Sequence, residues 1–240
     1  MIAVIGGTGK LGQGLAMRWA LVGEEVVLGS RSIEKAQRVK LELSEKTGKK
    51  IRGATNLDAV YQADFIVFSI PFEGIGKIVD EIRPALSSEK TIISAIVPLK
   101  LEKNMLVCYT PPASSAAEEV ARLVGGKINV CSALHTVGAQ QLHRVGEAMK
   151  GDIVVCGDNA RAKQVTMKYI ERITELSAVD GGPLCNSRLI EPVAALLVEL
   201  THIHKVPGVG ISFSGLEKIK KLKSPRTTRA MKRRGLHEER

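Results

Sequence analysis

The sequence predicts an α/β fold with a doubly wound parallel sheet, followed by a small C-terminal α/β cap and a long dimerisation helix. Apolar segments of strand length alternate with helical segments along most of the chain. A glycine-rich turn follows the first apolar segment and opens the first helix. Near the C-terminus, one helical segment carries apolar residues on almost every side, so it must be buried on more than one side.

The first strand is predicted at Met1–Ile5, and the segment Gly7-Thr-Gly-Lys-Leu-Gly12 then supplies a G-x-G-x-x-G motif. In this interpretation Gly7 allows a sharp turn, Gly9 lets backbone approach a pyrophosphate, and Gly12 lets the following helix pack on the strand. The N–H groups of the helix N-terminus then face the phosphates. Because the motif lies between a strand and a helix, it predicts a Rossmann-type dinucleotide site. A tight glycine turn without a ligand is the alternative.

The remaining segments continue the alternation. Strands are predicted at 25–29, 51–54, 63–70, 91–97, 127–133, 152–157 and 178–180. Helices are predicted at 32–46, 56–62, 73–82, 114–124, 139–149, 159–176 and 186–204. Ser32 is a candidate N-cap, and Pro192 predicts either a kink near Arg188–Ile190 or a helix that begins only at Pro192. An extended segment is expected at 207–213.

Composition limits the class of protein. With 240 residues and 44% hydrophobic residues, the chain can bury a core. Its longest apolar runs, such as Ile92–Val97, are too short to span a bilayer, and the N-terminus lacks the basic start of a signal peptide. We therefore expect a soluble, cytoplasmic protein. Cys131 and Cys156 lie in strand-like apolar runs and are expected to be buried free thiols rather than disulfide or metal ligands.

The net charge of +10 is concentrated at the C-terminus. Residues 217–240 contain ten Lys or Arg against three Glu, which gives +7 for this segment alone. The last part of the chain, 214–240, is therefore interpreted as a basic tail. A solvated extension without a dedicated partner is favoured, and contact with nucleic acid or acidic partners is the alternative.

The end of the second strand predicts the choice of dinucleotide. NAD-binding folds place an Asp or Glu there to hold the ribose 2′-hydroxyl. This chain has Ser30 and Arg31 instead, with Lys35 one helical turn later. A hydroxyl and a guanidinium can bind a 2′-phosphate, and no carboxylate follows Gly29 to repel one. The pattern therefore favours NADP, with a solvated charged loop as the alternative.

The sequence resembles the NADPH-dependent reductases of coenzyme F420, an 8-hydroxy-5-deazaflavin, which occur in archaea and some bacteria. The first matching blocks are Gly6-Gly-Thr-Gly-Lys-Leu-Gly-Gln-Gly-Leu-Ala16, Gly29-Ser-Arg31, Glu34-Lys-Ala36 and Ser69-Ile-Pro71. The later blocks are Ser132-Ala-Leu-His-Thr136, Val155-Cys-Gly-Asp158 and Gly182-Pro-Leu-Cys-Asn-Ser-Arg-Leu-Ile-Glu191. The later blocks make the resemblance specific, since dinucleotide binding alone does not require them.

The resemblance implies direct hydride transfer between C4 of the nicotinamide and C5 of the deazaflavin, without a metal or an obligatory side-chain acid. It places NADP(H) against Thr8, Gly9, Leu11, Ser30, Arg31, Lys35, Ile70 and Pro71. It places the stacked nicotinamide and deazaflavin rings at His135, Val137 and Ala139, with Val209 and Gly210 closing the F420 pocket. The implied organisation is an NADP-binding domain at 1–133, a small domain at 134–213 that completes the deazaflavin pocket, and the tail at 214–240.

Several polar residues leave alternatives open. His135 either orients a ring or protonates the reduced deazaflavin, or is a loop histidine bonded to backbone. Arg188 and Glu191 are interpreted as an ion pair one turn apart, with contact between Arg188 and a cofactor as the alternative. His202 and His204 cannot share a helix face and are interpreted as structural.

The apolar helix at 186–204 predicts a homodimer, because one monomer of this size can hardly cover it. Two other functions remain open. One is an NADP-dependent reductase of a small imine or hydroxy acid, although such enzymes continue with a long helical domain. The other is a non-catalytic NADP-binding sensor.

Overall fold

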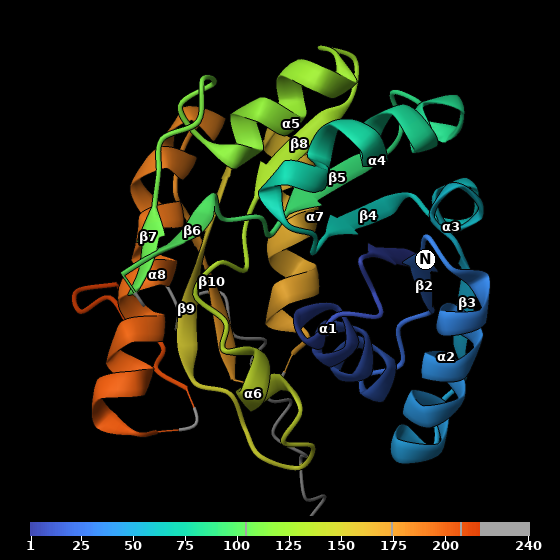
Figure 1. The fold of residues 1–240 in the computed structure, drawn as a ribbon, viewed down its shortest axis with the longest axis horizontal. Coiled ribbons are helices and arrows are strands. Elements are labelled where there is room, and N and C mark those ends of the chain that lie inside the picture. The colour runs from blue at the N-terminus through green and yellow to red at the C-terminus, as the bar shows by residue number, and fades with distance from the viewer. Residues whose placement is uncertain (104, 174, 207, 217–240) are drawn as a thin grey trace, which may run out of the picture.

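A sheet of eight strands runs through the part of the chain that the computed structural model describes, residues 1–216 except 104, 174 and 207 (Figure 1). The strand order is β10-β9-β8-β5-β4-β1-β2-β3. The bounds are β1 (Ile2–Ile5), β2 (Val26–Ser30), β3 (Ile51–Thr55), β4 (Phe65–Phe68), β5 (Thr91–Ser94), β8 (Asn129–Ser132), β9 (Gly151–Gly157) and β10 (Leu176–Asp180). A separate hairpin consists of β6 (Leu99–Glu102) and β7 (Met105–Cys108).

The helices connect these strands. Their bounds are α1 (Lys10–Leu21), α2 (Ile33–Thr47), α3 (Asn56–Gln62), α4 (Ile75–Ile82), α5 (Ala116–Val124), α6 (Ala139–Leu142), α7 (Ala160–Glu171) and α8 (Ser187–His204). Helices cover both faces of the sheet, as a doubly wound fold requires. Buried side chains of α1, α2 and α7 form one core, and those of α3, α4 and α5 form the other. The predicted Rossmann-type architecture is confirmed.

The direction of the strands changes once. β3, β2, β1, β4, β5 and β8 are parallel, whereas β9 pairs antiparallel with β8 through Cys131↔Gly157 and Ser132↔Cys156. β10 is parallel to β9. The chain can reverse here because residues 133–150 contain only the four-residue helix α6 instead of a long crossover helix. The sheet thus continues beyond residue 133, and the division into domains at that point remains a prediction.

Most element predictions are confirmed in position but not in length. Ser32 is the N-cap of α2, since its side chain accepts a hydrogen bond from the N–H of Lys35 at 3.1 Å. The predicted helix 139–149 is wrong beyond Leu142, because the backbone carbonyls that follow turn toward α1. The predicted helix 159–176 is also too long: α7 ends at Glu171, and the buried Leu176 begins β10.

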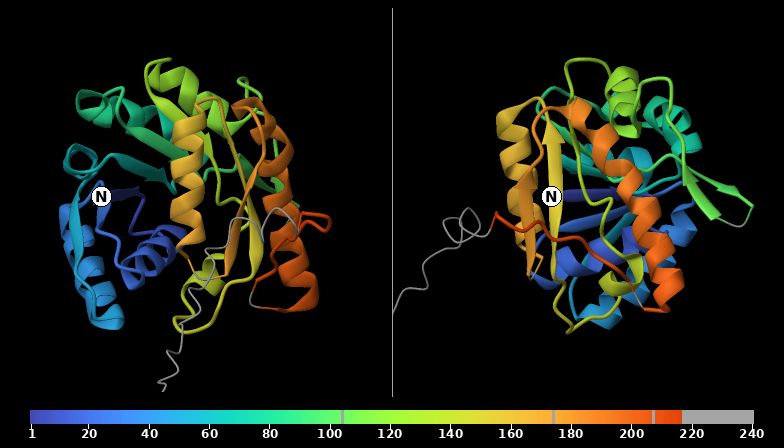
Figure 2. Two further views of the ribbon diagram at one scale, coloured as in Figure 1. Left: turned by 180° about the vertical axis from the view of Figure 1, so that it is seen from behind. Right: turned by 90° about the vertical axis from the view of Figure 1, so that its left-hand side faces the viewer.

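The β6–β7 hairpin was not predicted from the sequence. Its strands pair from Leu99↔Cys108 to Glu102↔Met105, and it lies against α8 (Figures 1 and 2). The N–H of Leu106 donates to the Glu199 carboxylate of α8 at 3.2 Å. Contact with a helix about 90 residues later in the sequence stabilises the hairpin, and short-range patterns carry no signal of such a contact.

α8 begins at Ser187, so the predicted alternative of a start at Pro192 is wrong. Among the described residues, no helix is long and apolar enough to cross a membrane. Cys131 and Cys156 are buried free cysteines, as predicted. The predicted basic tail lies outside the described residues from position 217 onward.

Candidate functional site

The glycine turn after β1 confirms the predicted strand–turn–helix arrangement, with one change of role. Gly6 has the left-handed φ of +77°, and a Cβ there would lie 2.5 Å from the carbonyl oxygen of Ser69. Gly7 does not supply this conformation. It is required because a Cβ would lie 2.7 Å from the Val4 carbonyl oxygen. At Gly12 a Cβ would lie 2.6 Å from the Gly6 carbonyl oxygen, so the close packing predicted for Gly12 is confirmed.

A cavity of about 660 Å³ opens beside this turn. Its walls come from the glycine turn, the end of β2, the start of α3, the end of β4 and the face of α4. The lining residues are Gly6, Thr8, Gly9, Ser30, Arg31, Ser32, Lys35, Asn56, Ser69, Ile70, Pro71, Glu73, Gly74, Lys77, Ile78 and Glu81. We call this the first cavity. Gly9 is the N-cap of α1 and has no side chain to cap the helix, so the first N–H groups remain available to a phosphate.

The positive side chains gather at one end of the first cavity. Arg31 and Lys35 line it, next to Ser30. The Ser32 hydroxyl is already used, because it accepts from Lys35 N and donates to the Glu34 carboxylate at 2.7 Å. Ser30 Oγ accepts from Ser32 N at 3.3 Å and keeps its own proton for another acceptor. This end can therefore hold a doubly charged phosphate through a guanidinium, an ammonium and a hydroxyl.

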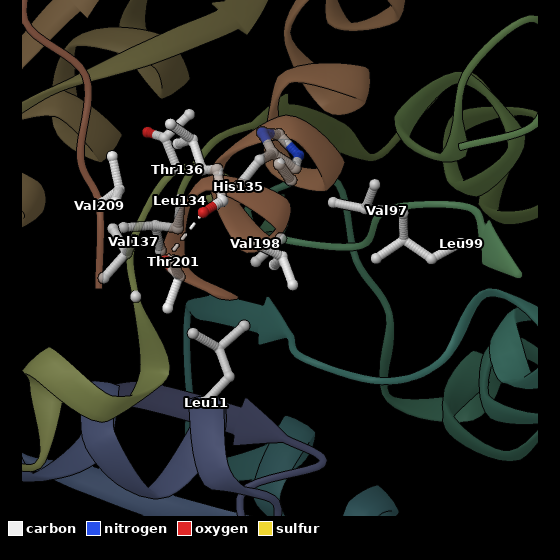
Figure 3. A pocket seen from close by; sticks show the side chains of 14 residues that line it. Leu11, Val97, Leu99, Leu134, His135, Thr136, Val137, Val198, Thr201 and Val209 are labelled. Atoms are coloured by element: carbon white, nitrogen blue, oxygen red, sulfur yellow. Dashed lines mark hydrogen bonds between the residues drawn. The ribbon is translucent and has the colours of Figure 1, made fainter. Parts of the chain in front are cut away.

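A second cavity, of about 240 Å³, lies on the other side of the start of α1. Leu11 points into it from α1, while His135 and Val137 come from the loop after β8 and Val198 from α8 (Figure 3). The full lining is Leu11, Ala95, Val97, Leu99, Leu134, His135, Thr136, Val137, Gly138, Ala194, Leu197, Val198, Thr201 and Val209. The walls are largely apolar. Ala139 and Gly210, which the sequence also suggested, do not line it: Ala139 begins α6, and Gly210 lies near the Lys150 carbonyl.

His135 is the titratable side chain of the second cavity. It is 8% exposed, and burial lowers its pKa to about 4. A hydrogen bond with the Ser94 backbone opposes this shift but is the smaller effect. Its Nε2 has no hydrogen-bond partner among the described residues. At neutral pH the ring is therefore uncharged, with one nitrogen bonded to backbone and Nε2 buried without a hydrogen-bond partner among the described residues.

Arg18 holds α6 and the segment that follows it, and sequence patterns did not single it out. Its guanidinium is buried and donates to four backbone carbonyls. The acceptors are Leu142 at 3.0 Å, Glu147 at 2.8 Å, Gln141 at 2.9 Å and Arg144 at 2.6 Å. In addition, a Cβ at Gly14 would lie 2.5 Å from Leu142 Cβ, so α1 and α6 are in close contact. The only sequence signal was an arginine between apolar residues of a buried helix.

The extended segment after α8 is held against β9. Asp152 N donates to the Ile211 carbonyl at 2.7 Å, and the Asp152 carboxylate accepts from Phe213 N at 2.7 Å. Gln141 Nε2 donates to the Gly208 carbonyl at 3.0 Å. These contacts place Val209 in the wall of the second cavity.

The predicted ion pair between Arg188 and Glu191 is wrong. Glu191 is 1% exposed, and its two carboxylate oxygens accept from the N–H groups of Ala116 at 2.8 Å and Ala117 at 3.0 Å, at the start of α5. Burial raises the pKa of Glu191 to about 7, although both hydrogen bonds oppose the shift. Arg188 is exposed and lines neither of the two cavities. His202 and His204 are exposed as well.

Comparison with known proteins finds long matches to F420-dependent NADP reductases. The F420-dependent NADP reductase of Methanothermobacter thermautotrophicus is 35% identical over 225 residues, which cover 90% of this chain and 95% of that protein. The F420-dependent NADP reductase of Methanocaldococcus jannaschii is 32% identical over 224 residues, which cover 90% and 99%. The chain belongs to the F420-dependent NADP reductase family. A family model described as "NADP oxidoreductase coenzyme F420-dependent" matches residues 1–98 of this reductase.

Solved structures support the fold of this F420-dependent NADP reductase. A protein from Arthrobacter sp. FB24 assigned to the same type of enzyme superposes with a TM-score of 0.75 at 20% identity, covering 89% of this chain and 98% of that one. A reductive aminase from Aspergillus terreus gives 0.61 at 15% identity. The match covers 85% of this chain but 62% of the aminase. The two chains thus share a fold, and more than a third of the aminase has no counterpart here.

Proposed function

We propose that this reductase transfers a hydride directly between NADP(H), bound in the first cavity, and the deazaflavin F420, bound in the second. One observation carries the proposal: the two cavities flank the start of α1. Thr8 and Gly9 line the first and Leu11 lines the second. A dinucleotide whose pyrophosphate lies at the α1 N-terminus can therefore reach the apolar second cavity with its nicotinamide.

Each wall then has a separate task. The α1 N–H groups and Thr8 hold the pyrophosphate, and Arg31, Lys35 and Ser30 hold the 2′-phosphate. Leu11, Val137 and Val198 exclude water from the place where the two rings meet. When both co-substrates are bound, the hydride moves between C4 of the nicotinamide and C5 of the deazaflavin. Catalysis by the protein is then mainly positioning of two planar rings.

His135 contributes orientation rather than a proton in this proposal. With a pKa of about 4, it is uncharged at neutral pH and so has no imidazolium proton to donate. Its Nε2 is buried and has no hydrogen-bond partner among the described residues, and a polar edge of the bound ring system is the partner that we propose for it, as donor or acceptor according to the tautomer. The assignment of Gly7, Gly9, Gly12, Ile70, Pro71 and Val209 to the cofactor sites is part of the same proposal.

The test is transfer of a label. NADPH carrying deuterium at the transferred C4 position should deliver it to C5 of the deazaflavin without exchange into water. Loss of the label to solvent would contradict direct transfer. Unlabelled NADPH in deuterated water is the matched control, and it should leave the transferred position free of deuterium.

We also propose that the enzyme is a cytoplasmic homodimer that uses the outer face of α8. Leu189, Leu196 and Ile203 are 69%, 57% and 67% exposed and follow one another at seven-residue intervals, so they lie along one side of the helix. Leu101 and Met105 of the adjacent hairpin are also exposed. A second copy of the same stripe would remove this apolar surface from water.

A further inference from the structure

The residues of α4 that line the first cavity, Lys77, Ile78 and Glu81, have no role in the function proposed above. The pyrophosphate and the 2′-phosphate occupy the glycine turn and the end of β2. The adenine base is then the part of NADP that must lie against the remaining wall. That wall contains Ile70, with Lys77, Ile78 and Glu81 of α4, Glu73 and Gly74 just before α4, and Asn56 beside Glu81.

The composition of this wall fits a purine. Ile78 is buried and Ile70 is partly buried, and both pack with the core beneath α3 and α4, so they offer a fixed apolar surface to the face of a base. Lys77 and Glu81 are four residues apart on α4 and therefore lie on the same side of the helix. A carboxylate only accepts hydrogen bonds and an ammonium only donates them. Adenine presents one exocyclic amino donor beside ring-nitrogen acceptors.

Glu81 is exposed at the edge of the cavity, and Asn56 is its partner there. Asn56 Nδ2 donates to Glu81 Oε2 at 3.1 Å. Asn56 is itself 1% exposed and is the first residue of α3, a helix whose start is fixed by the Thr55 cap. Asn56 therefore directs the Glu81 carboxylate at the edge of the cavity, and one carboxylate oxygen remains for a ligand.

We infer that Glu81, positioned by Asn56, recognises the adenine of NADP by accepting a hydrogen bond from its exocyclic amino group. Lys77 donates to a ring nitrogen of the same base. This inference rests on the proposed function, because it assumes that NADP binds in the first cavity. It makes Glu81 a specificity residue: a base with a carbonyl oxygen in place of the amino group would present an acceptor to the carboxylate where adenine presents a donor.

The experiment compares two dinucleotides that differ at this group and at the adjacent N1, which carries a proton when C6 bears a carbonyl. Dissociation constants are measured for NADPH and for reduced nicotinamide hypoxanthine dinucleotide phosphate, in which a carbonyl replaces the adenine amino group. The wild-type protein should prefer NADPH by about threefold to tenfold, the range of a net hydrogen bond at a site open to solvent. In Glu81→Gln the ratio should fall to about one, because the amide can donate to the carbonyl as well as accept from the amino group.

Asp80→Asn is the matched control. It removes the same charge from the neighbouring position of α4, but Asp80 pairs with Arg83 at 3.0 Å and does not line the first cavity. Its preference for NADPH should equal that of the wild type, and thermal melting checks that each variant is folded. A wild-type ratio near one, or an unchanged ratio in Glu81→Gln, would overturn this inference alone. Failure of the wild type to bind either dinucleotide would overturn the proposed function together with it.

Discussion

Arg31 should set the preference for NADPH over NADH, and replacing it with Asp is the most informative change in the first cavity. Arg31 follows β2, where an NAD enzyme carries a carboxylate. The neighbouring Ser32 hydroxyl is used in capping α2, and Ser30 can donate only one hydrogen bond. The guanidinium is therefore the main group at this end that can bind the 2′-phosphate with more than one donor.

The magnitude follows from the strength of a charged hydrogen bond. Such a bond contributes about 1.5–3 kcal/mol, which at about 1.4 kcal/mol per decade is roughly 10- to 150-fold in affinity. Lys35 lines the same end of the cavity and partly compensates for the loss, so the lower part of this range applies to removal of the guanidinium alone. Arg31→Asp adds a carboxylate that repels the phosphate and can hold a free ribose hydroxyl.

The assay is the dissociation constant of each dinucleotide for wild-type and variant protein. Arg31→Asp should bind NADPH more than tenfold more weakly and NADH equally well or better. Arg38→Asp is the control, since Arg38 is exposed on α2, pairs with Glu42 at 3.8 Å and does not line the first cavity. If Arg31→Asp keeps the wild-type preference for NADPH, the 2′-phosphate is bound elsewhere and the interpretation of this loop is wrong.

Three further outcomes are expected. The folded-state pKa of Glu191 is raised from 4.5 to about 7, so the protein should lose stability toward urea as the pH rises from about 4.5 to about 7. Glu191→Gln should remove that dependence, and an identical pH profile in the variant would contradict the assignment. Arg18→Lys should destabilise the loop after α6 by about 1.5–3 kcal/mol. It should also raise KM for the deazaflavin more than KM for NADPH, and equal changes in both constants would argue against a positioning role. Leu196→Asp should yield a monomer in sedimentation experiments, while Leu41→Asp, which alters a comparably exposed leucine on α2, should sediment like the wild type.

The parts of the fold that depend on local physics could be predicted from the sequence. Each of these parts is determined by a few neighbouring residues: the glycine motif, the Ser32 cap and the buried apolar run of β4. The later sequence blocks resemble those of the F420-dependent NADP reductases, and this resemblance identified the family. The first cavity also brings together most of the residues expected around NADP, because they follow the carboxyl ends of parallel strands.

The features that were predicted wrongly or missed depend on contacts between residues far apart in the sequence. Glu191 lies at the correct spacing for a pair with Arg188, yet its carboxylate caps a helix that begins at position 116. Arg18 binds carbonyls more than 120 residues away. The hairpin β6–β7 depends on α8, and the adenine-facing wall becomes visible only when α3 and α4 are seen together. A pattern of neighbouring residues contains no information about partners that lie this far away in the sequence.

The proposed transfer of a hydride from NADPH to F420 is tested most directly by following both co-substrates in one mixture. Pure protein is mixed with NADPH and the oxidised deazaflavin, and the absorbance of each is recorded over time. One deazaflavin should be reduced for every NADPH oxidised, at a rate that depends on the concentration of protein. Binding of NADPH without oxidation, or oxidation of NADPH with no change in the deazaflavin, would contradict the proposed function.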